Sequence, residues 1–191
     1  ATANQSFSDY DYDIRIFSNP CEMREELRRH NQNNKARMIA GYCYPWKSKK
    51  DKSQYDIFLK DGFKAQWNFT TEDFATDPDS FEQVGCIHST QGLEFDYVGV
   101  IIGLDLRYDK ENGKVITDYT KRAKSDITIK GVRTDEDRRL ADRIIRNTYR
   151  TLLTRGQKGC FVYCQDSALS DYIKERLEEK KELNVEIERL I

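Results

Sequence analysis

The chain has 191 residues, near the upper edge of the usual single-domain range, so one core with surface insertions is expected. Hydrophobic residues make up 38% and charged residues 34%, which is typical of a globular protein with a strongly charged surface. The 32 Lys and Arg against 33 Asp and Glu give a net charge of −1, which excludes a general attraction of the chain to polyanions or acidic membranes. Any basic binding site must therefore be local.

Several kinds of segment and site are not expected. The sequence has no run of about 18 apolar residues and starts with a polar, acidic segment, so we expect neither a membrane-spanning helix nor a signal peptide. We therefore expect a cytoplasmic protein without a membrane partner. The cysteines include no CxxC spacing and there are 2 histidines, so we expect no metal site and reduced, mostly buried thiols at positions 21, 43, 86, 160 and 164.

The first part of the chain predicts a strand, a helix and a strand. Residues 1–13 show no periodicity and are expected to form a flexible lead-in; they begin without methionine, as a piece of a longer protein would. A short strand at Ile14–Phe17 is followed by a helix that starts at Pro20 and ends in the Asn31–Asn34 cluster. Residues 35–44 form a short apolar run, typical of a buried strand.

A hairpin and two further strands are predicted next. Asp61-Gly62 lies between two short segments, Tyr55–Leu59 and Phe63–Trp67, and such a pair favours a tight primed turn because that turn needs positive φ. Two apolar runs, Val84–His88 and Tyr97–Gly103, are predicted as buried strands.

The second half of the chain begins with a polar stretch. Residues 105–134 indicate a surface excursion from the core. A long helix is predicted at about 135–154, with Gly156 as a left-handed stop. A buried strand at 159–165 and a final helix at about 167–182 complete the pattern.

Strands and helices alternate, and the strands are continuous apolar runs, as expected for parallel strands covered on both faces. The sequence therefore predicts a three-layer α/β fold, with a mostly parallel sheet and a β-hairpin insertion. We expect one domain at 14–182 and a tail at 183–191.

The standard phosphate-binding motifs are missing from the chain. It contains neither GxxxxGK[ST] nor GxGxxG, so it has no standard cradle of its own for a nucleoside triphosphate or a dinucleotide. The acidic pair Asp135-Glu136 begins the long helix and does not end an apolar strand, so we interpret it as helix-start charge and not as a Mg²⁺ site.

Two segments resemble motifs of superfamily 1 helicases. A polar turn follows the strand that begins at Val84, and turns after parallel strands are where open α/β sheets bind ligands. This turn contains His88-Ser-Thr-Gln-Gly-Leu-Glu-Phe95, which resembles motif V. The second segment is Tyr149-Arg-Thr-Leu-Leu-Thr-Arg-Gly-Gln-Lys158, which resembles motif VI with Gly156 in place of the usual alanine.

A third segment narrows the resemblance. Residues 37–46 lie where the motif IV strand would be, and Gly41–Trp46 matches the Gly-Tyr-x-x-Pro-Trp pattern of the schlafen-like, viral-type helicase family. The resemblance covers about residues 35–166 and implies the second RecA-like domain of a P-loop NTPase. It also implies that the phosphate loop and the Mg²⁺ ligands lie on an N-terminal RecA-like domain of the same polypeptide.

The resemblance implies a nucleic-acid-dependent ATPase or helicase, with ATP and Mg²⁺ as cofactors and single-stranded DNA or RNA as the partner. In that family Arg155 would be the arginine finger, and Gln91 is placed with it in the catalytic part of the site. Gly92 would approach the γ-phosphate, Glu94 would hydrogen-bond the ribose or adjoining groups, and Arg150 is a second candidate for phosphate contact. The residues that would touch the nucleic-acid backbone are His88, Ser89 and Thr90.

A helical wheel at about 100° per residue tests these arginines. Arg155 falls on the apolar side of the long helix, where a cation must point into a cleft or meet an acid because unpaired burial is costly. A simpler role, neutralising the helix C-terminus, stays open. Another side of the helix carries four arginines and is predicted to be a solvated face: Arg139, Arg143, Arg146 and Arg150.

Other functions stay open at this point. The excursion at 105–134 carries a net charge of +3 and contains Lys121-Arg-Ala-Lys124, which suits either a phosphate backbone or plain solvation. The alternative function is a non-catalytic nucleic-acid- or protein-binding module with a helicase-like fold. A weaker alternative is a carboxylate–metal nuclease that uses Glu94, Asp96 and Asp105.

Overall fold

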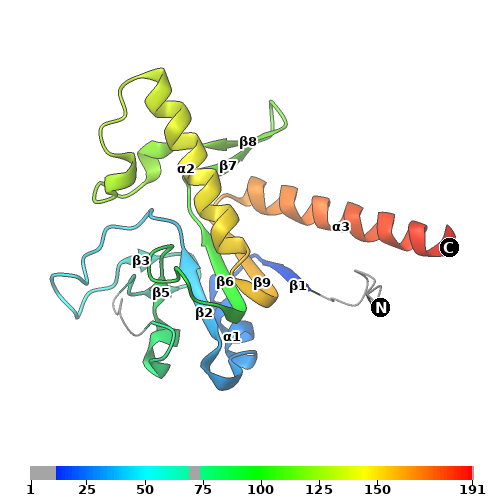
Figure 1. Ribbon diagram of the computed structural model, residues 1–191, viewed down its shortest axis with the longest axis horizontal. Coiled ribbons are helices and arrows are strands. Elements are labelled where there is room, and N and C mark those ends of the chain that lie inside the picture. Colours follow the sequence, from blue (N-terminus) through cyan, green and yellow to red (C-terminus); the bar gives the residue numbers. More distant parts are fainter. Residues whose placement is uncertain (1–11, 69–73, 191) are drawn as a thin grey trace, which may run out of the picture.

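The computed structural model describes residues 12–68 and 74–190, so residues 1–11 of the expected lead-in lie outside the described part. Its centre is a five-stranded sheet in the order β1-β9-β6-β2-β5 (Figure 1). All four strand pairs are parallel, which confirms the predicted mostly parallel sheet. The five strands are β1 (Asp13–Phe17), β2 (Ala36–Ala40), β5 (Val84–Gly85), β6 (Phe95–Ile102) and β9 (Gly156–Cys164).

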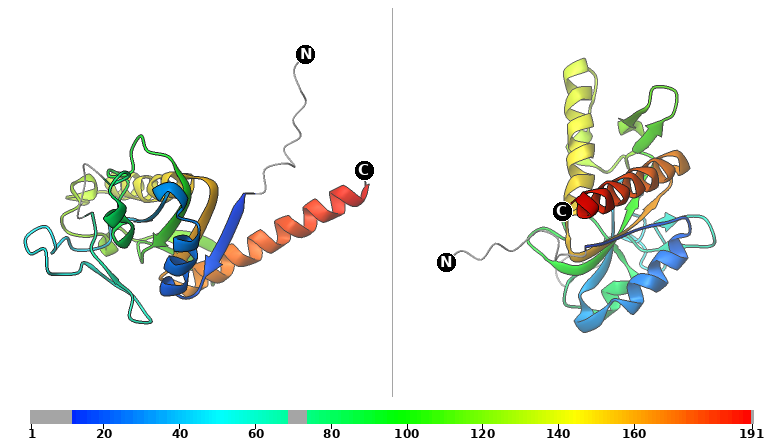
Figure 2. Two further views of the ribbon diagram at one scale, coloured as in Figure 1. Left: turned by 90° about the horizontal axis from the view of Figure 1, so that it is seen from below. Right: turned by 90° about the vertical axis from the view of Figure 1, so that its right-hand side faces the viewer.

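Helices cover both faces of the sheet and give it three layers (Figure 2). On one face, α1 (Pro20–Arg29) buries Met23 and Leu27 against the sheet. On the other face, α2 (Asp135–Leu153) buries Ile145 and Leu152, and Leu169 of α3 (Ser167–Leu190) belongs to the same core. The predicted three-layer α/β fold is therefore confirmed.

The starts of two helices follow from capping residues in the sequence. The Asn19 side chain accepts a hydrogen bond from the Cys21 N–H at 2.8 Å, at the start of α1. Thr134 and Asp137 form a reciprocal capping box at the start of α2. The pair at 135–136 lies in the first turn of α2, as interpreted from the sequence.

The final helix is longer than predicted. Instead of ending near Glu182, α3 continues to Leu190 and extends beyond the sheet (Figure 1). No glycine or proline occurs between 167 and 190, so nothing in the local sequence ends the helix earlier. No helix in the described part of the chain is long and apolar enough to cross a membrane.

Two hairpins flank the sheet. Strands β3 (Ile57–Phe58) and β4 (Lys64–Ala65) are antiparallel, and the turn residues between them, Asp61 and Gly62, both have positive φ, which confirms the predicted primed turn. A second hairpin, β7 (Leu106–Asp109) and β8 (Lys114–Thr117), lies inside the stretch that the sequence indicated only as a surface excursion.

Strand β5 is shorter than the predicted strand at 84–88. It ends at Gly85 because the chain turns away from the ladder at Cys86, whose N–H donates to the Ser89 hydroxyl at 2.8 Å. His88 is therefore exposed on a turn and does not belong to a strand.

Gly156 does not act as a left-handed helix stop. The C-cap of α2 is Thr154, and Gly156 is the first residue of β9 with no positive φ. Glycine is needed there for another reason, because a Cβ atom would lie 2.1 Å from the backbone oxygen of Gly159.

Candidate functional site

The turn at 86–94 connects β5 to β6 on the α2 side of the sheet, where Ile87 and Leu93 pack against the core. Gln91 and Gly92 are exposed at its apex. Gly92 has a φ of 75°, a left-handed conformation that glycine adopts without steric penalty. The apex therefore faces solvent, and the backbone around Gly92 is open to a ligand.

Ser89 and Thr90 are buried within this turn. The Ser89 hydroxyl accepts from the Cys86 N–H and donates to the Cys86 carbonyl at 3.0 Å, and the Thr90 hydroxyl donates to the same carbonyl at 3.0 Å. These hydroxyls shape the turn and are not directed to solvent. This corrects the sequence-based expectation: of His88, Ser89 and Thr90, only His88 presents its side chain.

The end of the turn meets the end of α2 at the amino ends of β6 and β9. The Phe95 N–H donates to the Arg155 carbonyl at 3.3 Å. Beside it, the Gln157 side chain donates to the Glu94 carboxylate at 2.6 Å. The two helicase-like segments, which lie far apart in the sequence, are therefore neighbours in space.

This placement differs from the expected location at the carboxyl ends of the strands. His88 does follow the carboxyl end of β5, but Glu94 and Arg155 lie at the opposite edge of the sheet, which we call the amino edge. The reason is that the turn at 86–94 itself crosses from one edge to the other.

Arg155 lies in the short junction between α2 and β9 and is partly exposed. Its buried Nε atom has no hydrogen-bond partner, and its guanidinium pairs with no acid among the described residues. The helical wheel predicted that Arg155 either points into a cleft or meets an acid. The part of the chain that the structure describes supplies no such acid. A buried donor without a partner is costly unless something else satisfies it.

An open depression of about 400 Å³ lies next to Glu94. Its walls include Asn33, Asn34 and Thr76. Behind it, the fully buried Arg37 guanidinium donates to main-chain carbonyls on both sides, at 3.0 Å to Asn34 and at 2.9 Å to Phe74. Burial lowers the pKa of Arg37 to about 10.

The residues that line this depression were not predicted as a site. The one signal in the sequence is Arg37 itself, because an arginine within a strand buried on both faces must find several acceptors. Its carbonyl partners, however, lie in loops that the sequence does not place.

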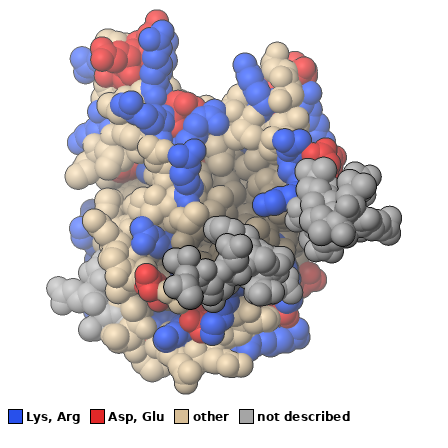
Figure 3. Space-filling view, turned by 45° about the vertical axis from the view of Figure 1, so that its right-hand side comes forward, with Lys and Arg blue, Asp and Glu red and all other residues tan. Residues whose placement is uncertain are grey.

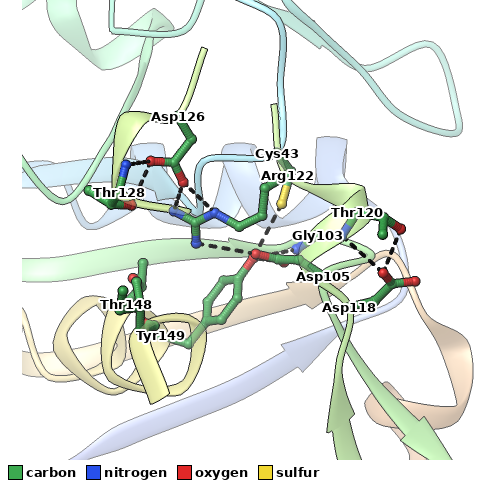
Figure 4. A network of polar contacts seen from close by, with 11 residues as sticks. Cys43, Gly103, Asp105, Asp118, Thr120, Arg122, Asp126, Thr128, Thr148 and Tyr149 are labelled. Carbon is green, nitrogen blue, oxygen red and sulfur yellow. Dashed lines mark hydrogen bonds and ion pairs between the residues drawn. The ribbon is translucent and has the colours of Figure 1, made fainter. Parts of the chain in front are cut away.

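At the other end of β6, which we call the carboxyl edge, polar groups form a buried network (Figure 4). The Tyr149 hydroxyl donates to Asp105 at 2.5 Å and accepts from the Gly103 N–H at 2.9 Å. Arg122 bridges Asp105, at 3.4 Å, and Asp126, at 2.7 Å. Burial raises the pKa of the Tyr149 phenol well above its ordinary value.

This network corrects two expectations from the sequence. Arg122 is tied to two buried acids and is not free to follow a phosphate backbone. The three carboxylates considered for a nuclease are also too far apart to share a metal ion. Glu94 and Asp96 lie at the amino edge, whereas Asp105 lies beyond the other end of β6. Asp96 also pairs with Lys158 at 2.7 Å.

Comparison with known proteins assigns the chain to a family. Residues 1–166 match the family described as "Schlafen group 3, DNA/RNA helicase domain". The chain belongs to this family. An uncharacterized protein of Saccharomyces cerevisiae is 28% identical over 174 residues, covering 84% of this chain and 36% of that protein. The chain thus spans about a third of the length of this curated relative. No solved structure matches the chain.

In this helicase-type domain, the exposed side of α2 carries the arginine face predicted from the sequence. Figure 3 shows basic side chains over α2, with acidic ones near its start. Arg146 pairs with Asp142 at 2.9 Å, whereas Arg150 and the remaining two have no ion pair among the described residues. The four exposed residues are Arg139, Arg143, Arg146 and Arg150.

Proposed function

We propose that this chain is the C-terminal RecA-like half of a nucleic-acid-dependent ATPase, with Arg155 as its arginine finger. The observation that carries the proposal is the junction at the amino edge. There the motif V turn and the segment that follows α2 are joined by the Phe95–Arg155 backbone hydrogen bond, and the Arg155 guanidinium has no acid partner among the residues that the structure describes. A guanidinium held in this way can stabilise a negative charge on a ligand that binds from outside the chain.

Arg155 suits this task for physical reasons. Its planar, permanently charged guanidinium offers several donors in a fixed geometry, which matches phosphoryl oxygens. Charge that develops on a transferring phosphoryl group is stabilised most by donors that are already in place. The backbone bond to Phe95 and the strand pairing of Gly156 hold the Arg155 main chain in place before any ligand binds.

The other residues assigned to the site fit part of an ATP site. The open apex at Gly92 allows close backbone approach to a phosphate, with Gln91 exposed next to it. Glu94 offers a carboxylate to a ribose hydroxyl at the rim of the depression. Arg150, on the exposed side of α2, is the second choice for phosphate contact.

In this proposal the remaining parts of the site come from an N-terminal RecA-like domain of the same polypeptide. The described residues contain no group of three or more His, Cys, Asp or Glu side chains that could hold a metal ion. We place the Mg²⁺ ligands and the phosphate loop on that domain. Bound ATP would supply the γ-phosphoryl group whose charge Arg155 stabilises.

The test is Arg155→Lys in the full-length protein. Lysine keeps the charge but not the planar fork, so we expect the ATP turnover number to fall on the order of 10³-fold. Nucleotide affinity should fall far less, because the finger acts mainly on the transition state. Steady-state hydrolysis and equilibrium binding of a fluorescent ATP analogue measure the two effects.

Arg143→Lys is the matched control, because Arg143 is exposed on α2 and unpaired among the described residues. It should leave turnover unchanged. Near-normal turnover in Arg155→Lys would refute the finger role. Absence of ATP hydrolysis from the unmodified full-length protein, with nucleic-acid binding intact, would favour the non-catalytic binding module.

A further inference from the structure

Two lysine-rich segments lie at the carboxyl edge of the sheet. The first, residues 47–52, follows β2, and the second, residues 119–131, follows β8. Besides Lys52, six lysines in these segments are exposed, and none of these six forms an ion pair among the described residues. We call them the carboxyl-edge lysines: Lys47, Lys49, Lys50, Lys121, Lys124 and Lys130.

The fold holds these two segments together. The Ala123 N–H donates to the Tyr42 carbonyl at 2.9 Å, which joins the second segment to the loop that carries the first. Figures 1 and 2 show both segments on the same side of the molecule. Arg122 anchors the second segment from beneath through Asp105 and Asp126. The backbone that carries the lysines beside Arg122 is therefore held in place.

Few acids neutralise these lysines. Asp51 is exposed within the first segment, but its carboxylate already accepts from the Ser53 hydroxyl at 2.6 Å and from the Gln54 amide at 2.9 Å. Asp126 is buried and bound to Arg122. A hollow of about 250 Å³ in the second segment is lined by both Lys124 and Lys130.

Clustered like charges repel one another unless a polyanion binds. Since the whole chain has a net charge of −1, this is a local feature and not a property of the composition. A protein partner would need a cluster of apolar anchors at its centre. Ile127 is the one large apolar side chain that is strongly exposed within the two segments, and it stands alone.

We propose that the carboxyl-edge lysines bind the phosphodiester backbone of a nucleic-acid strand. Lysines are flexible point charges that contact phosphates without reading bases, so binding is tolerant of sequence. His88 follows β5 at the same edge and extends the contact surface toward the motif V turn. This inference rests on the nucleic-acid part of the proposed function and does not depend on ATP hydrolysis.

The test measures binding of a 20-nucleotide oligothymidylate to the full-length protein without ATP, over a range of salt concentrations. Two triple variants are compared: Lys47→Gln, Lys49→Gln and Lys50→Gln in one, and Lys121→Gln, Lys124→Gln and Lys130→Gln in the other. Each lost phosphate contact should lower the slope of log K against log salt by about 0.7 and weaken binding ~5-fold at 0.1 M salt. A triple variant that loses all three contacts should therefore lose on the order of a hundredfold in affinity.

The matched control changes three exposed cations outside this surface: Lys114→Gln, Arg139→Gln and Arg143→Gln. It alters the net charge equally and should keep both the affinity and the salt slope. Unchanged binding in both lysine variants, or an equal loss in the control, would overturn the proposal. So would polyglutamate of matching charge that binds as tightly as the oligonucleotide, since that result points to an acidic protein.

These outcomes are independent of the test of Arg155. Because the binding assay contains no nucleotide, loss of the finger role would leave its result unchanged. Conversely, failure of the lysine variants to alter binding would leave the turnover prediction for Arg155→Lys in place.

Discussion

The two ends of the central sheet differ in the pairing of an arginine, Arg155 at the amino edge and Arg122 at the carboxyl edge. At the amino edge, the Arg155 guanidinium has no acid partner among the described residues, and Glu94 is exposed beside an open depression. At the carboxyl edge, Asp105, Arg122 and Asp126 are buried and bonded to one another.

The difference indicates two roles. A buried ionic network satisfies its own charges, so it supports the fold and offers nothing to a ligand. An arginine held in place by its backbone but not paired by its side chain is suited to a charge from another molecule. The carboxyl edge can still bind through the carboxyl-edge lysines, because these are exposed and form no ion pair in the described part of the chain.

The sharpest test of this contrast is Arg122→Met. The change removes the cation between Asp105 and Asp126 and leaves two buried carboxylates without it. Breaking a buried pair in this way costs about 3–5 kcal/mol of unfolding free energy. Urea unfolding followed by circular dichroism measures the loss.

Lys121→Met is the matched control, since Lys121 is the preceding residue and is exposed. It should change the unfolding free energy by less than about 0.5 kcal/mol. If Arg122→Met were as mild as the control, the network would not support the carboxyl edge, and Arg122 would be available for binding after all.

Much of the fold could be predicted because its signals are local. Asn19-Pro20 and Thr134 mark helix starts, and Asp61-Gly62 marks a hairpin, each within a few residues. The long apolar runs identified the strands in the same way. The ends of helices and strands were harder to predict. Gly156 was expected to end a helix, but it begins β9, where glycine is needed because of the close approach of Gly159.

The candidate site could be predicted only in part. The order of the two helicase-like motifs indicated Glu94 and Arg155 as site residues. The structure places them at the ends of neighbouring strands. The burial of Ser89 and the pairing of Arg122 could not be foreseen. Both depend on which partners the fold supplies: Asp126 is four residues from Arg122 but outside any α-helix, and Asp105 is 17 residues away from it.

A second prediction concerns rigidity at the amino edge, through Gly156→Ala. An added Cβ would lie 2.1 Å from the Gly159 oxygen, which is backbone and cannot move aside cheaply. We expect a loss of about 1–3 kcal/mol in unfolding free energy from overpacking. Chemical denaturation of the variant measures it.

Gly92→Ala provides the comparison for this change. A Cβ there meets nothing within 4 Å, so the cost comes from the positive φ alone and should be about 1 kcal/mol. A loss in Gly156→Ala no larger than that of Gly92→Ala would mean that the junction beside Arg155 adjusts freely. The amino edge would then not be held in place before a ligand binds.

The smallest expected effect concerns alkaline pH at the carboxyl edge. Cys164 is the last residue of β9, and burial raises the pKa of its thiol to about 12. A group whose pKa is higher in the folded state contributes stability that is complete below its unfolded pKa, near ~8.5 for a thiol, and is lost as pH rises above it. The unfolding free energy should therefore fall by about 1.4 kcal/mol per pH unit for this thiol alone between roughly pH 9 and 10.

Cys164→Ala should remove that contribution and make the decline with pH shallower by the same amount, as measured by urea unfolding at a series of pH values. Leu169→Ala is the control, because Leu169 is buried in the same core but carries no titratable group. It should lower stability equally at every pH and leave the slope as it is. An unchanged slope in Cys164→Ala would show that this thiol ionises as readily in the folded chain as in the unfolded one, and that the end of β9 at the carboxyl edge is open to water.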